Sequence, residues 1–272
     1  MTSNLLDRQI DDILESVLET SSGTLLVVNP SADAIEEFVR VATAFDGDLP
    51  AVRMLADERT LKDVMDDFIV ASNAADLIDQ EALELRTVAE TPENSLLITE
   101  ESVVALVTAG NRVGGLTTDD EEFVSTAYDA YEAEWADASS FKLRTPPISR
   151  VRETLESDIS PEAEQDFTNI LNSLETARGD GEGLDEVTIS LLVAAKNEAL
   201  LYDISKWGED VGIASKATFS RTKTKLEDMG LIDTEKVPID VGRPRLRLKI
   251  GDERLRTADN GQLATVAQSI LN

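Results

Sequence analysis

The sequence predicts two domains of different classes: an α/β domain with a small, mostly parallel sheet, and an α+β domain of the winged helix-turn-helix type. Short apolar runs alternate with amphipathic helical segments over the first half of the chain. After residue 200, two helical segments around a Gly-containing turn precede a pair of strand-like segments. At 272 residues the chain exceeds the usual size of one domain. We therefore expect an α/β domain at 1–145, a helical linker at 146–183 and a winged domain at 184–272.

The N-terminal segment has the pattern of alternating helices and strands. An apolar stripe predicts a helix over 4–20, and the apolar run 24–28 predicts a buried strand. Ser31 is a suitable N-cap for the helix that follows. The remaining expected helices are 32–44, 59–71, 74–79 and 119–137, and the remaining expected strands are 51–55, 83–88, 95–99 and 102–108. The Gly-containing segment 111–115 predicts a turn or loop.

A Pro-Pro pair at 146–147 precedes two further helical segments, 149–157 and 161–178. The second segment carries an apolar stripe on one face, formed by Phe167, Ile170, Leu171 and Leu174. A short linker helix cannot bury such a stripe by itself. We expect the stripe to pack against the same helix of a second chain or against the N-terminal helix. We also expect a homodimer, because one recognition helix covers too few base pairs for specificity. The Gly-rich residues 179–183 predict a hinge.

The last segment has the element order of a winged helix-turn-helix domain. Expected helices are 185–201, 204–211 and 215–229, followed by strands at 234–241 and 245–250 and a closing helix at 261–272. The third helix has an inward apolar face at helical spacing, so its hydroxyl and basic residues point outward, toward phosphates and base edges of DNA. These expected DNA contacts are Ser215, Lys216, Thr218, Ser220, Arg221 and Lys225.

The predicted wing is also basic. Arg243 stands beside Gly242 at its tip, and Arg245 follows Pro244. An arginine at such a tip is attracted into the minor groove of DNA, where the potential is strongly negative. We expect both arginines to contact DNA. The alternative interpretation is a charged edge strand that discourages aggregation.

The formal net charge of −29 is unevenly distributed along the chain. The first 141 residues carry seven bases and 31 acids, whereas residues 215–249 carry nine bases and five acids. A basic segment on so acidic a background favours contact with a polyanion. A high density of carboxylates is typical of proteins from a molar-salt cytoplasm, so we expect a halophilic source. A DNA mimic would also be acidic, but it would not need a basic wing.

The chain contains no Cys and no His, which excludes disulfides, zinc fingers, Cys nucleophiles and Ser-His-Asp triads. The Gly-rich phosphate loops of nucleotide-binding enzymes are missing as well. We therefore expect no enzyme activity, metal or cofactor, although Asp57 or Glu100 remains a candidate base. No apolar stretch is long enough to span a membrane and no signal-peptide pattern is found, so we expect a cytoplasmic protein.

The segment 204–232 resembles the winged helix-turn-helix regulators of archaea and bacteria. The matching parts are GlyIle at 212–213, SerLysAlaThrPheSerArg at 215–221, LeuGluAsp at 226–228 and GlyLeuIle at 230–232. Two positions depart from the usual pattern: Ala214 adds one residue to the turn, and Lys223 replaces an apolar residue. With its acidic α/β half, the whole chain is similar to the haloarchaeal TbsP-type transcriptional regulators. This resemblance implies a regulator of central carbon metabolism genes that senses a phosphorylated sugar.

For such an effector, position and charge point to the N-terminal domain. The loops after strands 24–28 and 51–55 precede helix starts, whose backbone N–H groups suit an anion. The expected effector-binding residues are Asn29, Ser31, Arg59 and Arg112. If the arginines instead pair with neighbouring acids, this domain is a dimerisation platform. A protein-interaction module, or a small-molecule sensor that does not bind DNA, is the alternative function.

Overall fold

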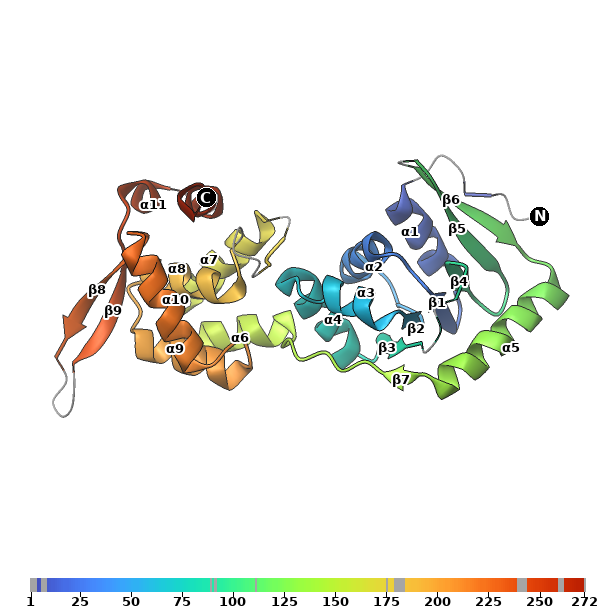
Figure 1. Ribbon diagram of the computed structural model, residues 1–272, viewed down its shortest axis with the longest axis horizontal. Helices are drawn as coiled ribbons and strands as arrows, with labels where there is room; N and C mark the ends of the chain where they lie inside the picture. Colours follow the sequence, from blue (N-terminus) through green and yellow to red (C-terminus); the bar gives the residue numbers. More distant parts are fainter. Residues whose placement is uncertain are drawn as a thin grey trace. The chain divides into compact units, whose positions relative to one another are not determined.

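A computed structural model describes residues 4–5, 9–88, 90, 92–110, 112–174, 176–178, 184–238, 244–258 and 262–271. The chain forms two compact units (Figure 1). The first consists of Met1–Met65 and Asn73–Leu143, and the second of Asp66–Ser72 and Arg144–Asn272. The second unit is thus assembled from two separate stretches of sequence.

The first unit is built on a seven-stranded sheet with the order β6-β5-β4-β1-β2-β3-β7 (Figure 1). Its centre is parallel, because β1 pairs with β2 and β2 with β3 in the same direction. The other four strands are added antiparallel on either side of this centre. The strands are β1 (Thr24–Val28), β2 (Ala51–Ala56), β3 (Leu83–Thr87), β4 (Leu96–Ile98), β5 (Val103–Ala109), β6 (Arg112–Thr118) and β7 (Ser139–Ser140). The predicted α/β class is confirmed.

Helices pack on both faces of this sheet. They are α1 (Ile10–Thr20), α2 (Ala32–Ala44), α3 (Glu58–Val64), α4 (Phe68–Asp79) and α5 (Glu121–Asp137). On one face, Val124 of α5 belongs to a buried cluster with Val103 of β5. The next residue of β5, Val104, lies on the opposite face beside Gly115, where Ile13 of α1 packs. The apolar stripe of α1 is therefore buried within its own unit.

Two expectations for this part of the chain are wrong. The segment 111–115 contains the start of β6, which pairs with β5 along its length. Gly115 serves close packing rather than a turn, since a Cβ atom there would lie 2.9 Å from Cγ1 of Val104. The single helix expected over 59–71 is interrupted, because the Asp67 carboxylate accepts a backbone N–H from the first turn of α4 at 2.9 Å and starts a new helix.

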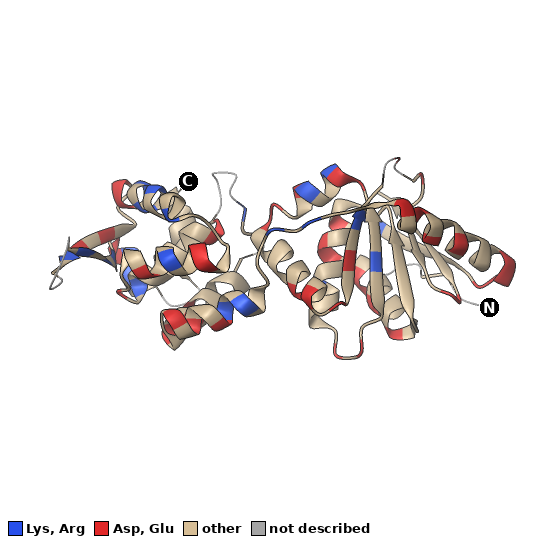
Figure 2. Ribbon diagram, turned by 90° about the horizontal axis from the view of Figure 1, so that it is seen from below, with Lys and Arg blue, Asp and Glu red and all other residues tan. Residues whose placement is uncertain are grey.

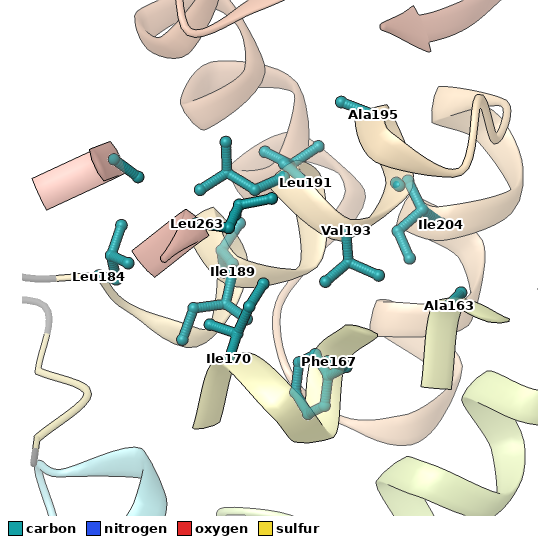
Figure 3. Packing of buried hydrophobic residues seen from close by; sticks show 14 of the residues in the cluster. Ala163, Phe167, Ile170, Leu184, Ile189, Leu191, Val193, Ala195, Ile204 and Leu263 are labelled. Carbon is teal, nitrogen blue, oxygen red and sulfur yellow. The ribbon is translucent and has the colours of Figure 1, made fainter. Parts of the chain in front are cut away.

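The second unit surrounds one central helix, α8, in which every residue from Val187 to Ala195 is buried (Figure 3). Helices α7, α9 and α10 and strand β9 pack against α8, which explains why it is apolar on all sides. The elements are α6 (Ile148–Asp158), α7 (Pro161–Asn172), α8 (Glu186–Lys196), α9 (Leu201–Val211), α10 (Lys216–Asp228), β8 (Ile232–Val237), β9 (Arg245–Ile250), α11 (Glu253–Thr257) and α12 (Leu263–Leu271). The predicted helix-turn-helix followed by a β-hairpin is confirmed.

The apolar stripe of α7 lies inside the core of the second unit. The Phe167 ring stands edge-on to Phe68 and to Trp207, with ring centroids 6.5 Å apart in both pairs. Ile170 is buried in the same cluster (Figure 3). Leu171 belongs to this cluster as well. The expectation that this stripe packs against a second chain or the N-terminal helix is therefore wrong, because α8 and α9 of the same chain cover it. Among the described helices of both units, none has the length and hydropathy that a membrane span requires.

Candidate nucleic-acid interface

The turn between α9 and α10 has the geometry that a helix-turn-helix requires. Gly212 ends α9 with a left-handed φ of 97°, which a residue with a side chain rarely adopts. The backbone N–H groups of Ile213 and Ala214 both point to the Gly208 carbonyl, at 2.8 and 3.3 Å. The additional residue Ala214 is thus accommodated by one shared acceptor. Ser215 then caps α10, because its Oγ accepts the backbone N–H of Thr218 at 3.2 Å.

The outer face of α10 carries hydroxyl and basic side chains. Phe219 and Leu226 are buried beneath the helix and fix its orientation on the core. Most of the predicted contact residues are exposed on the other side, and Thr218 is half-buried; they are Ser215, Lys216, Thr218, Ser220, Arg221 and Lys225. Arg221 reaches back toward the Thr218 hydroxyl at 3.5 Å. The helix therefore presents hydroxyls near its positive N-terminal end and cations along its length, which suits contact with phosphates.

The first base of α10 is held by an acid of α9. Nζ of Lys216 lies 2.8 Å from one carboxylate oxygen of Glu209, and the Lys216 backbone N–H donates to the other at 3.3 Å. The hydrogen bond from Lys216 lowers the pKa of Glu209, and the same bond raises the pKa of Lys216. Both groups are therefore charged at neutral pH.

The base of the wing is oriented by α9 in a similar way. The guanidinium of Arg245 lies over the Tyr202 ring, 4.6 Å from its centroid, and donates to Asp203 at 3.4 Å. The Tyr202 side chain is 49% exposed, so this stack lies at the surface. Arg243, the other predicted wing contact, is outside the described residues. The stack and the ion pair preorganise Arg245 beside the start of α9.

Glu227 forms an ion pair within α10 and a hydrogen bond that connects α10 to the wing. Lys223 donates to Glu227 at 2.7 Å, and the other Glu227 oxygen accepts from the Thr234 hydroxyl of β8 at 2.7 Å. These two hydrogen bonds, that of Lys223 first, lower the pKa of Glu227. Only 11% of the Lys223 side chain is exposed, so most of the side chain is covered by the fold. Lys223 therefore supports the fold and does not belong to the outer face of α10.

The charge distribution separates the two units. Figure 2 shows bands of Lys and Arg on the helices and the hairpin of the second unit, while Asp and Glu predominate on the helices of the first. In the first unit, Arg53 and Arg86 lie over the Trp135 ring, 5.8 and 4.5 Å from its centroid. They also pair with Glu132 and Glu84, so both arginines take part in structural contacts.

The four predicted effector residues lie at three places in the first unit: the loop after β1, the first turn of α3 and the start of β6. Asn29, with a φ of 45°, donates to the Pro92 carbonyl at 2.6 Å, and Ser31 caps α2. Ser31 also lines a cavity of about 220 Å³. Arg59 is 90% exposed and faces Asp63 at 3.8 Å, while Arg112 is exposed at the start of β6. The structure brings Asn29 and Ser31 together after β1, but neither arginine lines the cavity at Ser31. Their role in effector binding stays a prediction.

Three residues of α9 that contact this surface were not predicted from the sequence. Tyr202, Asp203 and Glu209 lie in the helix that precedes the turn, and they hold cations of α10 and the wing. Their spacing of seven residues places Tyr202 and Glu209 on one side of α9. The spacing could have shown that both residues lie on one side of α9. It could not show which bases they contact, because those bases belong to other elements.

Comparison with known proteins gives the family of the chain. The N-terminal model of TbsP-like transcriptional regulators matches residues 2–146, and their C-terminal helix-turn-helix model matches residues 147–268. The chain belongs to the TbsP-like transcriptional regulators. The TbsP-like helix-turn-helix domain contains the α9–α10 motif and the wing described above. No curated protein sequence matches the chain.

Two solved structures share a low similarity with the chain. TrmBL2, described as an archaeal chromatin protein with a novel mode of DNA binding, is 15% identical with a TM-score of 0.38, over 52% of this chain and 54% of that chain. NucT from Helicobacter pylori is 13% identical with a TM-score of 0.35, over 51% of this chain and 99% of its own. The chain thus matches about half the length of TrmBL2. Neither likeness is close enough to say more about this TbsP-like protein.

Proposed function

We propose that this TbsP-like protein is a sequence-specific regulator that binds promoter DNA through the outer face of α10 and the wing. The main support is the set of exposed hydroxyl and basic side chains on α10, together with Arg245 preorganised on Tyr202. In this proposal Ser220, Arg221 and Lys225 face the major groove, and the wing follows the backbone or minor groove. The family, a class of transcriptional regulators, favours this function over catalysis.

We also propose a homodimer that acts in the cytoplasm of a halophile and regulates genes of central carbon metabolism in response to a phosphorylated sugar. One recognition helix covers too few base pairs for promoter specificity, which favours two copies on two half-sites. The net charge of −29 is in keeping with molar salt. In this scheme the first unit senses the effector or holds the dimer. The second unit, whose core includes the helices expected at 146–183, binds DNA.

Chromatin immunoprecipitation with sequencing, followed by fluorescence anisotropy on the recovered duplex in molar KCl, tests the proposal. Replacing Arg221 by Ala is expected to weaken binding by about 1–3 kcal/mol if the arginine reads a base. Arg254→Ala, a change on exposed α11, is the matched control and is expected to leave affinity unchanged. If no duplex is enriched, or if Arg221→Ala binds as tightly as the wild type while folded, the alternative of a sensor without DNA binding is preferred.

A further inference from the structure

A cavity of about 380 Å³ lies at the base of the wing, between the end of α8, the end of β9 and α11. Its lining combines three cations, one carboxylate and an apolar floor, given by Lys196, Lys249, Arg256, Glu198, Ile250 and Leu255. The chain has 25 bases against 54 acids, so three bases around one cavity are a local reversal of its charge. A cavity of this size, with a few convergent polar groups over an apolar floor, has the dimensions of a small-molecule site.

Each cation of the cavity already has a carboxylate partner. Lys196 pairs with Asp166 at 2.8 Å, Lys249 with Glu235 at 2.7 Å, and Arg256 with Glu253 at 3.3 Å. The pairs of Lys249 and Arg256 are solvent-exposed on both sides, and exposed pairs of this kind contribute little to stability. An anion in the cavity therefore disturbs little when it approaches Lys249 and Arg256, whereas Lys196 stays paired with the nearly buried Asp166 and adds its charge to the lining.

The cavity is connected to the wing through the backbone of β9. Nε and a terminal N–H of Arg256 donate to the Ile250 carbonyl at 3.1 and 3.0 Å, which fixes the guanidinium at the end of this strand. Lys249 shares one face of β9 with Arg245, because strand residues alternate and the two are four positions apart. A ligand bound by Lys249 and Arg256 thus contacts the strand that carries the wing's predicted DNA contact.

Neither of the two cavities described in the first unit has a comparable lining. Its cavity at Ser31 is lined by Asp33, and its larger cavity of about 430 Å³ is lined by Glu101 and Asp119. No Lys or Arg of the described residues lines either one. An organic phosphate carries about two negative charges and needs several cations, preferably including an Arg that forms two hydrogen bonds. The charge of the lining therefore favours the cavity at the base of the wing.

We propose that this cavity binds a small organic phosphate, with the phosphoryl group held by Lys196, Lys249 and Arg256. Its carbon skeleton lies against Ile250 and Leu255. The inference rests on the proposed response to a phosphorylated sugar, and it assigns that ligand to the DNA-binding unit.

Isothermal titration of the full chain in KCl of fixed molar concentration tests the site directly. The probes are inorganic phosphate, glucose 6-phosphate and fructose 1,6-bisphosphate, with glucose as the uncharged reference. We expect a sugar phosphate to bind and glucose not to bind. Lys249→Gln is expected to weaken binding at least tenfold, whereas Arg254→Gln, on the same helix as Arg256 but outside the cavity, leaves it unchanged. If no phosphate binds, or if Lys249→Gln and Arg254→Gln behave alike, the proposal is wrong.

Arg256→Lys provides a second variant that keeps the charge but loses the paired hydrogen bonds to Ile250. It is expected to bind the sugar phosphate more weakly than the wild type.

The same three cations could instead bind the phosphates of DNA. Anisotropy on the operator duplex without ligand distinguishes a DNA contact from a small-molecule site. We expect Lys249→Gln to bind DNA with the wild-type salt dependence. The opposite result has two parts: the slope of log DNA affinity against log salt falls by about one in Lys249→Gln, and no sugar phosphate binds the wild type. That result would assign these cations to contact with the DNA backbone and overturn the proposed site. If the ligand binds but DNA affinity does not change, the site stands and only the proposed sugar response fails.

Discussion

The ring of Phe219 in α10 lies directly against the backbone of Gly208 in α9. A Cβ atom at position 208 would stand 2.3 Å from Cε2 and Cζ of that ring, which is far inside contact distance. The two helices of the DNA-binding motif are therefore set at their separation by a glycine that has no room for a methyl group. Phe219 is completely buried, so its ring cannot move outward without opening the core.

Replacing Gly208 by Ala is expected to destabilise the second unit by about 1–3 kcal/mol, because overpacking forces the ring or the helix to shift. Thermal unfolding followed by circular dichroism in molar KCl measures the change. The double variant Gly208→Ala with Phe219→Leu is expected to recover part of the lost stability, because the smaller leucine leaves room for the new methyl group. A single variant as stable as the wild type would contradict this account of the interface.

Removing the aromatic support of the wing is expected to weaken DNA binding. In Tyr202→Leu the Arg245 guanidinium loses its cation–π interaction and becomes mobile. Such an interaction contributes about 0.5–1 kcal/mol at an exposed site. Anisotropy on the operator duplex is expected to show a several-fold lower affinity, with the larger loss in Arg245→Ala. Equal affinities for Tyr202→Leu and the wild type would mean that the stack does not orient a DNA contact.

Neutralising the acid that holds Lys216 is expected to have the opposite effect. Glu209→Gln frees Lys216 for a phosphate and removes a negative charge from the proposed interface. The variant is expected to bind DNA more tightly, with a steeper dependence of log affinity on log salt. Asp210→Asn is a charge-matched control on the same helix, because Asp210 pairs with Lys206. If the two variants change affinity equally, the effect comes from net charge and not from release of Lys216.

The ion pair of Glu227 is expected to make the second unit less stable in acid. Because its pKa in the folded chain is lowered by Lys223 and Thr234, the ionised form stabilises the fold above the ordinary range of Glu, about pH 4.3. This contribution is lost as the pH falls through the lowered folded pKa. Urea unfolding is expected to give the wild type a higher free energy of unfolding than Glu227→Gln at pH 6. This difference is expected to disappear as the pH falls to 3. A wild type and a Glu227→Gln variant that differ equally in stability at pH 6 and pH 3 would contradict this role of Glu227.

The sequence was sufficient to predict local elements but not all of their partners. The order of α9, α10, β8 and β9 followed from hydrophobic spacing and from the glycine at 212, because both are local signals. The burial of Phe167 was missed, since its partners Phe68 and Trp207 lie 99 residues before it and 40 residues after it. The same holds for Tyr202 and Arg245, whose contact joins residues 43 positions apart. Such contacts depend on tertiary packing, which cannot be predicted from the hydrophobic periodicity of a single segment.

The membership of Asp66–Ser72 in the second unit limits how this protein can be taken apart. A fragment that begins at residue 147, as the helix-turn-helix family model does, lacks Phe68 and so leaves a hole beside Phe167. It also lacks Asp67, whose carboxylate accepts the Ala177 N–H at 3.2 Å and pairs with Arg178. The DNA-binding half is therefore not a transplantable module, and a chimaera that grafts it onto another sensor has to carry this seven-residue insert along with it.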